Sequence, residues 1–121
     1  MQSTPKPGET FWLWFLKILT GLLILVILGV HLVVNHFLAP QGLLSHAEVV
    51  AYYQNPIVPL MEGLFLLFLV SHSLLGLRSI LLDLNAGPRL LRLADAFFLL
   101  FGAGVSVYGL WLLYTVRSLG A

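Results

Sequence analysis

The sequence predicts an all-α membrane protein with three transmembrane helices. Of its 121 residues, 60% are hydrophobic and only 9% are charged, whereas a soluble domain carries roughly 25% charged residues. Three apolar stretches, at about 11–38, 60–84 and 89–117, exceed the roughly 20 helical residues that a bilayer crossing requires. Because lipid offers backbone groups no hydrogen-bonding partner, we expect each stretch to be helical. Residues 1–121 are expected to form a single transmembrane domain.

The first stretch is too long to be a cleaved signal peptide, whose apolar region spans roughly 7–15 residues. We therefore interpret it as a retained span. Thr10 stands immediately before it as a candidate N-cap, and the sequence LAPQG at 38–42 is expected to end it.

The other two stretches follow residues that break helices. Asn-Pro at 55–56 and Pro59 lead into the second stretch, and NAGP at 85–88 forms a tight break before the third. One stripe of the third stretch carries small and polar residues, namely Asp95, Gly102, Ser106 and Gly109. Small residues on one face favour close helix packing, and we expect the carboxylate of this stripe to lie near Arg92.

The distribution of basic residues predicts the orientation in the membrane. The connection at 39–59 has no Lys or Arg, whereas basic residues cluster near the N-terminus and around the second connection, namely Lys6, Lys17, Arg78, Arg89 and Arg92. Positive charge marks the cytoplasmic side. We therefore expect a multi-pass protein of the cell inner (cytoplasmic) membrane, with its N-terminus and the 85–92 turn in the cytoplasm.

Composition narrows the chemistry of the chain. The absence of cysteine excludes disulfides, thiolate metal sites and sulfur-ligated clusters within this chain. The net charge of +1 says little about partners, and we expect no nucleic acid among them. The sequence also has no nucleophile–base pair, phosphate loop or cluster of carboxylates, so one chain supplies too few groups for a complete active site.

Polar residues within the second stretch fall on one stripe, which contains His72, Gly76, Ser79 and Asp83. Such a stripe faces a protein partner or a cofactor rather than lipid. His72 lies 11 residues from the end of the stripe, about 16 Å along a helix and near mid-membrane. Its imidazole is suited to three roles: a hydrogen bond to another helix, proton relay, or ligation of a metal such as haem iron. Gly76 clears space for a flat ligand or for a closely packed helix.

The first stretch places Lys17 near the inner side and His31 about 21 Å farther, in the outer half of the bilayer. The lysine either snorkels to the surface or pairs with an anionic group inside the assembly. A haem between two histidines needs both imidazoles at one depth, and His31 and His72 do not match. If His72 binds iron, the second ligand therefore belongs to another chain, and His31 would serve a second, outer haem.

Residues 72–83, H-S-L-L-G-L-R-S-I-L-L-D, resemble the second helix of the membrane-anchor (cytochrome b) subunits of succinate dehydrogenase/fumarate reductase, respiratory complex II. In that family the helix carries a haem-ligating histidine, a glycine four residues later and a closing aspartate. The segments W-F-L-K-I-L-T-G-L at 14–22 and G-V-H-L at 29–32 resemble the family's first helix. The similarity spans nearly the whole chain.

The resemblance implies a non-catalytic anchor of succinate:quinone oxidoreductase, with the succinate site on other subunits. It would pair with a second membrane-anchor subunit around haem b and dock iron–sulfur and flavoprotein subunits, with quinone as the substrate in the membrane. His72 would be an axial ligand of haem b. Lys17 would lie near the haem propionates or the quinone, and Asp83 beside the quinone. Arg78 would pair with a propionate or a lipid phosphate, and His31 would be an outer-haem ligand in two-haem members or a helix contact in single-haem ones.

Three positions depart from the family pattern. Lys17 replaces an arginine and loses its bidentate fork, Leu84 stands where a quinone-contacting tyrosine is expected, and Leu75 replaces an asparagine. An alternative interpretation is a haem-free structural three-helix subunit of another membrane complex. A small transporter ranks last, because the sequence shows no repeat symmetry. The type of quinone, the number of haems and the direction of the reaction stay open.

Overall fold

The computed structural model describes residue 7 and residues 9–37 and 45–120. Helix α1 (Phe11–Leu32) continues as a π-helical segment, η1 (Val33–Phe37), and is followed by a short α2 (His46–Tyr52) and by the long helices α3 (Ile57–Asp83) and α4 (Pro88–Ser118). No strand occurs in this part of the chain. Three of its helices are long and apolar enough to cross a membrane, at Phe11–Phe37, Ile57–Asp83 and Pro88–Ser118. The predicted all-α fold with three spans is confirmed.

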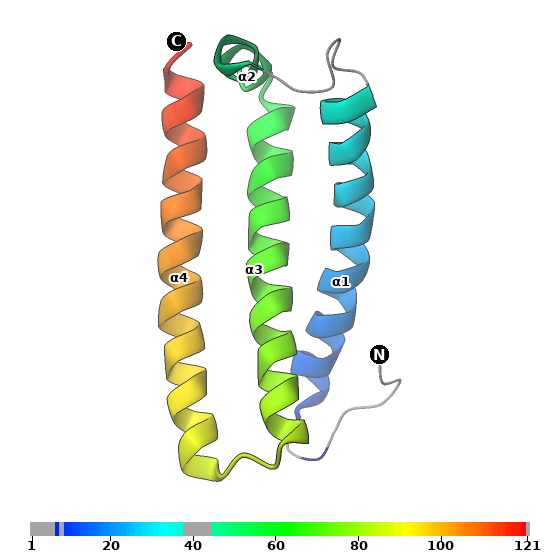
Figure 1. Cartoon of the computed structure of the whole chain (residues 1–121), viewed down its shortest axis with the longest axis vertical. Helices are drawn as coiled ribbons and strands as arrows, with labels where there is room; N and C mark the ends of the chain where they lie inside the picture. Colours follow the sequence, from blue (N-terminus) through cyan, green and yellow to red (C-terminus); the bar gives the residue numbers. More distant parts are fainter. Residues whose placement is uncertain (1–6, 8, 38–44, 121) are drawn as a thin grey trace.

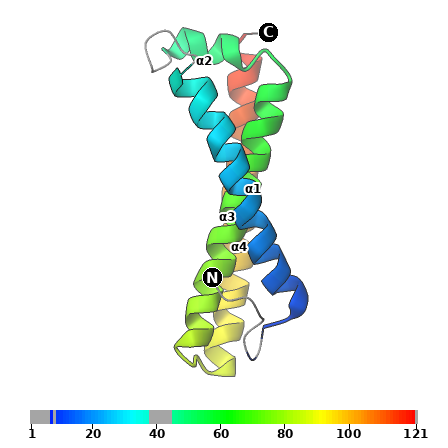
Figure 2. The same ribbon diagram turned by 90° about the vertical axis from the view of Figure 1, so that its right-hand side faces the viewer.

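Helix α3 is the middle helix, with α1 packed on one side and α4 on the other (Figure 1). The beginning of α1 and the α3–α4 turn lie at one end of the molecule, and α2 and the end of α4 lie at the other (Figure 1). Figure 2 shows that α1 is inclined across α3 rather than parallel to it. We call the first end the N-terminal end and the other the α2 end.

The pattern of burial is inverted relative to a soluble protein. Among the described residues, the buried polar side chains are Lys17, Thr20 and Ser79, and Val58 is the buried large apolar one. Leucine, valine and phenylalanine side chains instead cover the outside of the helices. Water would make that surface costly, so the natural surroundings of the helices are hydrocarbon. The 31 residues of α4 extend about 46 Å at 1.5 Å per residue, more than the roughly 30 Å hydrocarbon core.

The helix ends agree with the local sequence, with small differences in position. Thr10 caps α1 as predicted, because its hydroxyl accepts a bond from the Leu13 amide at 3.3 Å. Helix α3 begins at Ile57, three residues before the predicted start at 60. The helix tolerates Pro59 in its first turn, because the amide hydrogen that proline lacks has no intrahelical partner there. Helix α4 begins at Pro88 itself, which occupies the N1 position.

The break after α3 is a Schellman turn centred on Asn85. This residue has φ of 56°, a left-handed conformation that asparagine tolerates. The Ala86 amide donates to the Leu81 carbonyl and the Asn85 amide to the Leu82 carbonyl, both at 3.1 Å. These two bonds satisfy carbonyls that the end of a helix leaves without partners, and the chain is free to reverse into α4.

Helix α2 was not predicted. It begins with a capping box, in which the Ser45 hydroxyl accepts from the Glu48 amide and the Glu48 carboxylate accepts from the Ser45 amide. At its far side, Gln54 Nε2 donates to the Arg117 carbonyl at 2.9 Å, which ties the connection to the end of α4. The predicted end of the first span, at 38–42, lies outside the described residues. The last described residue before it is Phe37, at the end of η1.

Small residues let α4 approach α3 closely. A Cβ added at Gly102 would stand 2.6 Å from a methyl carbon of Leu74, and one at Gly109 would collide with Leu66. The predicted packing role of the small-residue stripe on the third span is therefore confirmed for its two glycines, which receive leucine side chains from the neighbouring helix.

Candidate functional site

His72 points from the middle of α3 toward α1. Its Nδ1 lies 2.9 Å from the Lys17 carbonyl oxygen and 3.3 Å from the Thr20 hydroxyl oxygen. The Thr20 hydroxyl donates its own proton to the Leu16 carbonyl at 2.6 Å. A carbonyl only accepts, so Nδ1 carries the proton of the imidazole. In the neutral ring, Nε2 is then the atom with a free lone pair.

Gly21 makes room for this imidazole. A Cβ at Gly21 would stand 2.9 Å from His72 Cε1 and 3.3 Å from His72 Nδ1, closer than real Cβ contacts allow. The absent side chain thus lets the ring lie against the α1 backbone. Gly76, one turn farther along α3, has nothing within 4 Å of its own Cβ position. The ring is held on one side and has open space beside the next turn of its helix.

Lys17 sits in a polar cluster at the N-terminal end. Its Nζ donates to Glu9 Oε1 at 2.9 Å and to Ser79 Oγ at 2.7 Å, and Ser79 Oγ in turn donates to Glu9 Oε1 at 3.4 Å. The side chains of Lys17 and Glu9 are only 11% and 4% exposed. An ammonium group this deep needs a paired anion, and Glu9 supplies it. Of the two expectations for Lys17, the structure shows the pairing with an anionic group, and that group is Glu9 of the same chain.

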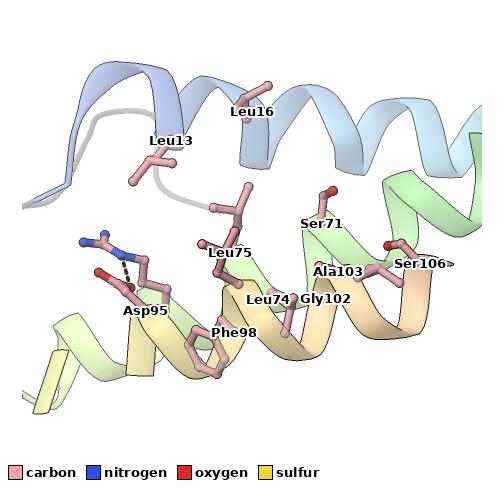
Figure 3. A pocket seen from close by; sticks show the side chains of 13 residues that line it. Leu13, Leu16, Ser71, Leu74, Leu75, Asp95, Phe98, Gly102, Ala103 and Ser106 are labelled. Carbon is pink, nitrogen blue, oxygen red and sulfur yellow. Dashed lines mark hydrogen bonds and ion pairs between the residues drawn. The ribbon is translucent and has the colours of Figure 1, made fainter. Parts of the chain in front are cut away.

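Arg78 pairs with α4. Its Nε donates to Asp95 Oδ1 at 2.9 Å, and the side chains are 15% and 43% exposed. Asp95, which was expected near Arg92, pairs with Arg78 in the structure, because residues of two packed antiparallel helices meet across the interface. The ion pair marks one end of a groove between α1, α3 and α4 (Figure 3).

His31 belongs to a second polar cluster, nearer the α2 end. Its Nδ1 lies 3.1 Å from Glu62 Oε1, and its ring stacks on Phe65 at a centroid distance of 5.8 Å. Asn35 Nδ2 donates to the His31 carbonyl at 3.0 Å, where the α-helix gives way to the π-helical segment. Glu62 precedes His72 by ten residues, about 15 Å along α3, so the two imidazoles lie at different levels.

The charge of Glu62 also affects two tyrosines, the last residue of α2 and the C-cap residue that follows it. Burial, and then the Glu62 and Tyr52 groups, raise the pKa of Tyr53 to about 12. Burial and the Glu62 charge likewise raise the pKa of Tyr52 above its ordinary value. The Tyr52 hydroxyl is buried without a hydrogen-bond partner among the residues that the structure describes. Helix α2 therefore contributes polar groups to the surroundings of this cluster.

Asp83 is the last residue of α3 and is exposed. It shares the N-terminal end of the molecule with the Lys17 cluster. Within the described ranges, no group of three His, Asp or Glu side chains is arranged to hold a metal ion. Any metal bound through His72 or His31 would therefore need further ligands from a cofactor or from another chain.

The chain matches the family model of the succinate dehydrogenase/fumarate reductase transmembrane subunit over residues 2–110. The chain belongs to this family. It is also 35% identical over 103 residues to the succinate dehydrogenase hydrophobic membrane anchor subunit of Archaeoglobus fulgidus, covering 85% of this chain and 87% of the relative. No solved structure matches it. The predicted resemblance is confirmed, and the protein is a multi-pass membrane-anchor subunit of the succinate dehydrogenase/fumarate reductase family.

The structure brings together two of the site residues that the sequence singled out, because the Lys17 carbonyl contacts His72. Arg78 lies in an ion pair with Asp95, and His31 lies in a separate contact with Glu62. Glu9 and Glu62 were not predicted as site residues. For Glu62 a signal existed, since a carboxylate within an apolar span is costly and marks a candidate site. For Glu9 there was none, because its segment precedes the helix and reaches Lys17 only through the fold.

Proposed function

We propose that this chain is an anchor of succinate:quinone oxidoreductase that ligates a haem b through His72 Nε2, opposite a histidine of a second membrane-anchor subunit. The observation that carries the proposal is the Nδ1 bond from His72 to the Lys17 carbonyl. A histidine that ligates a metal typically donates its other ring N–H to a carbonyl or carboxylate, which fixes the tautomer. Haem iron supplies one-electron redox chemistry to such a site.

The residues around His72 suit a flat, anionic cofactor. Gly21 seats the imidazole against α1, and the space at Gly76 leaves room beside it. Lys17 and Ser79 provide a buried ammonium and hydroxyl, which are suited to a propionate carboxylate in place of Glu9. This chain would bind and orient the group, while redox chemistry belongs to the cofactor.

The quinone would bind at the cytoplasmic end, between Lys17 and Asp83. Lys17 can donate to a quinone oxygen, and Asp83, exposed at the end of α3, can pass protons from water. Iron–sulfur and flavoprotein subunits would dock on the same side, where succinate oxidation takes place. Leu84 offers no hydroxyl at the place of the family's tyrosine, so a partner subunit would supply that hydrogen bond.

His31 would ligate a second, outer haem in a two-haem arrangement. Glu62 favours this, because a carboxylate that accepts from Nδ1 leaves His31 Nε2 as the ligating atom. In a single-haem arrangement, the same pair would only join α1 to α3.

Absorption spectra of the purified complex test the proposal. In a reduced-minus-oxidised spectrum, His72→Ala should lose the b-type band, whereas His36→Ala, at an exposed position near the α2 end, should keep it. His31→Ala should remove part of the band only if a second haem is present. Co-purification of the partner subunits with each variant shows whether the complex assembles. The absence of a b-type band from the wild-type complex would support the haem-free structural alternative, and an assembled His72→Ala complex that keeps the band would exclude His72 as the ligand.

A further inference from the structure

The Lys17 ammonium and the Ser79 hydroxyl together form a site for one oxygen atom, which Glu9 fills. Both groups donate to the same carboxylate oxygen, Glu9 Oε1, at 2.9 and 3.4 Å, and the ammonium also donates to the Ser79 hydroxyl at 2.7 Å. The side chains of Lys17 and Glu9 are 11% and 4% exposed, and Ser79 is buried. Hydrogen bonds from an ammonium to a carboxylate are stronger than neutral ones. We call this pair of donors the Lys17–Ser79 seat, and its chemistry favours an anionic oxygen.

The Lys17–Ser79 seat lies on the same face of the molecule as His72. Ser79 follows His72 by seven residues, about 10 Å along α3, and it lies on the same stripe of that helix. Lys17 is tied to the imidazole through its backbone, because its carbonyl accepts from His72 Nδ1. A ligand that extends from His72 toward the N-terminal end therefore reaches both donors of the seat.

Glu9 competes with such a ligand for the seat. The two hydrogen bonds converge on Oε1, so a ligand oxygen that accepts both of them takes the position of this atom. Lys17 and Ser79 lie within α1 and α3, whereas Glu9 precedes Thr10, the N-cap of α1. The Glu9 side chain can therefore turn away from the seat without opening a turn of the helix.

The charge of Lys17 explains why the seat has an occupant from the same chain. An ion within a membrane protein is costly unless it has a partner, and removal of one partner from a buried ion pair leaves an uncompensated charge. Glu9 supplies the partner when no ligand is bound. The same ion pair must be broken when a ligand oxygen enters, so its stability is subtracted from the affinity for the ligand.

We propose that Glu9 is an internal substitute for the ligand of the Lys17–Ser79 seat and that it lowers the affinity of the seat for that ligand. The inference rests on the proposed function, in which the ligand oxygen belongs to a haem propionate or to a quinone. Glu9 is thus a positioning residue. It holds the ammonium and the hydroxyl in place until a ligand arrives, and then it leaves the seat.

Two measurements on the purified complex test the competition, one for each source of the oxygen. Transfer of haem from the complex to apomyoglobin, followed by the loss of the b-type band, reports on a propionate in the seat. The KM for quinone reports on a quinone oxygen, and turnover of succinate with a soluble dye shows that the soluble subunits are intact.

The variant Glu9→Gln keeps the shape of the side chain and removes its charge. We expect slower transfer of haem or a lower KM for quinone, in either case by about tenfold, because a charge-assisted hydrogen bond no longer has to be broken. The double variant Lys17→Met/Glu9→Gln removes both charges and should change the same quantity in the opposite direction. Glu9→Asp keeps the charge but shortens its reach, so it should act like Glu9→Gln by a smaller factor, and it tests the proposal if Glu9→Gln does not assemble.

Glu48→Gln is the matched control. It makes the same substitution in the capping box of α2, where glutamine also serves, and it should change neither quantity. The proposal is wrong if Glu9→Gln acts in the same direction as the double variant, because Glu9 would then support the bound ligand, or if it changes neither quantity. A wild-type complex without a b-type band would instead overturn the haem part of the proposed function, and the KM for quinone would then decide the role of Glu9.

Discussion

Individual polar residues of the transmembrane helices are buried while apolar residues are exposed, which reverses the pattern of a soluble protein. Thr20, Ser79 and Lys17 are buried while most large apolar side chains are exposed. Each of these polar groups has a partner on another element or on its own backbone, since an unpaired polar group in hydrocarbon is costly. The partners determine what each residue can do, and His72 is the clearest example because one carbonyl fixes its tautomer.

At the scale of single residues, we expect Gly21→Ala to displace the His72 imidazole and to destabilise the protein. The added methyl would stand 2.9 Å from His72 Cε1, so the ring must shift or the helices must separate, at a cost of about 1–3 kcal/mol. The measurement is the thermal unfolding of the purified complex together with its b-type absorption band.

Gly29→Ala is the matched control for that variant. Nothing lies within 4 Å of a Cβ at this position of the same helix, and alanine in place of a helical glycine stabilises by about 0.5–1 kcal/mol. If Gly21→Ala and Gly29→Ala gave the same stability and the same band position, the close seat of the imidazole on α1 would be wrong.

The ends of the helices follow capping and turn patterns of the local sequence, and only some of these patterns were recognised as predictions. The turn at 85–88 and the cap at Thr10 were predicted, because their signals lie within a few residues. Helix α2 was not predicted, although Ser45 and Glu48 have the spacing of a capping box. Seven residues form too short a helix to show periodicity. Its capping box stabilises it, and Gln54, just beyond the helix, ties the connection to the Arg117 carbonyl of α4.

At the scale of this element, Ser45→Ala should loosen α2. Loss of an N-cap costs about 0.5–2 kcal/mol, and for so short a helix this cost appears as local opening rather than unfolding of the whole protein. Amide hydrogen exchange over 46–53 should therefore become faster. Ser118→Ala, whose hydroxyl donates within its own helix at 2.7 Å, should leave exchange in α2 unchanged, and similar effects of both variants would contradict the role of the cap.

The arrangement of the whole molecule leaves α3 as the shared middle helix. Its stripe at His72 faces α1 and the proposed partner, and its other side forms the floor of the groove with α4. One helix thereby contributes both to the proposed cofactor site and to the groove. Lys17, Arg78, Arg89 and Arg92 lie at the N-terminal end of this arrangement, which is the basis for the predicted orientation, and Arg117 lies at the α2 end.

Labelling tests that orientation on the whole molecule. We expect Ala47→Cys, exposed on α2, to react with a membrane-impermeant maleimide in intact cells. Ala86→Cys, in the α3–α4 turn, should react only after the cells are opened and the soluble subunits are stripped. The absence of native cysteine makes each label specific. Reaction of the Ala86→Cys variant in intact cells would reverse the orientation and move the proposed docking face to the other side.

The sequence by itself determined the class of the protein and its three spans, and it singled out His72 as a candidate site residue. Lipid requires long apolar helices, and polar residues within such helices are rare, so they are easily recognised in the sequence. Only the tertiary structure decided which groups meet. Glu9 reaches Lys17, Glu62 reaches His31, and Arg78 pairs with Asp95 of the neighbouring helix. Contacts between helices depend on the rotation and tilt of each helix, and side-chain packing sets these rather than any local pattern.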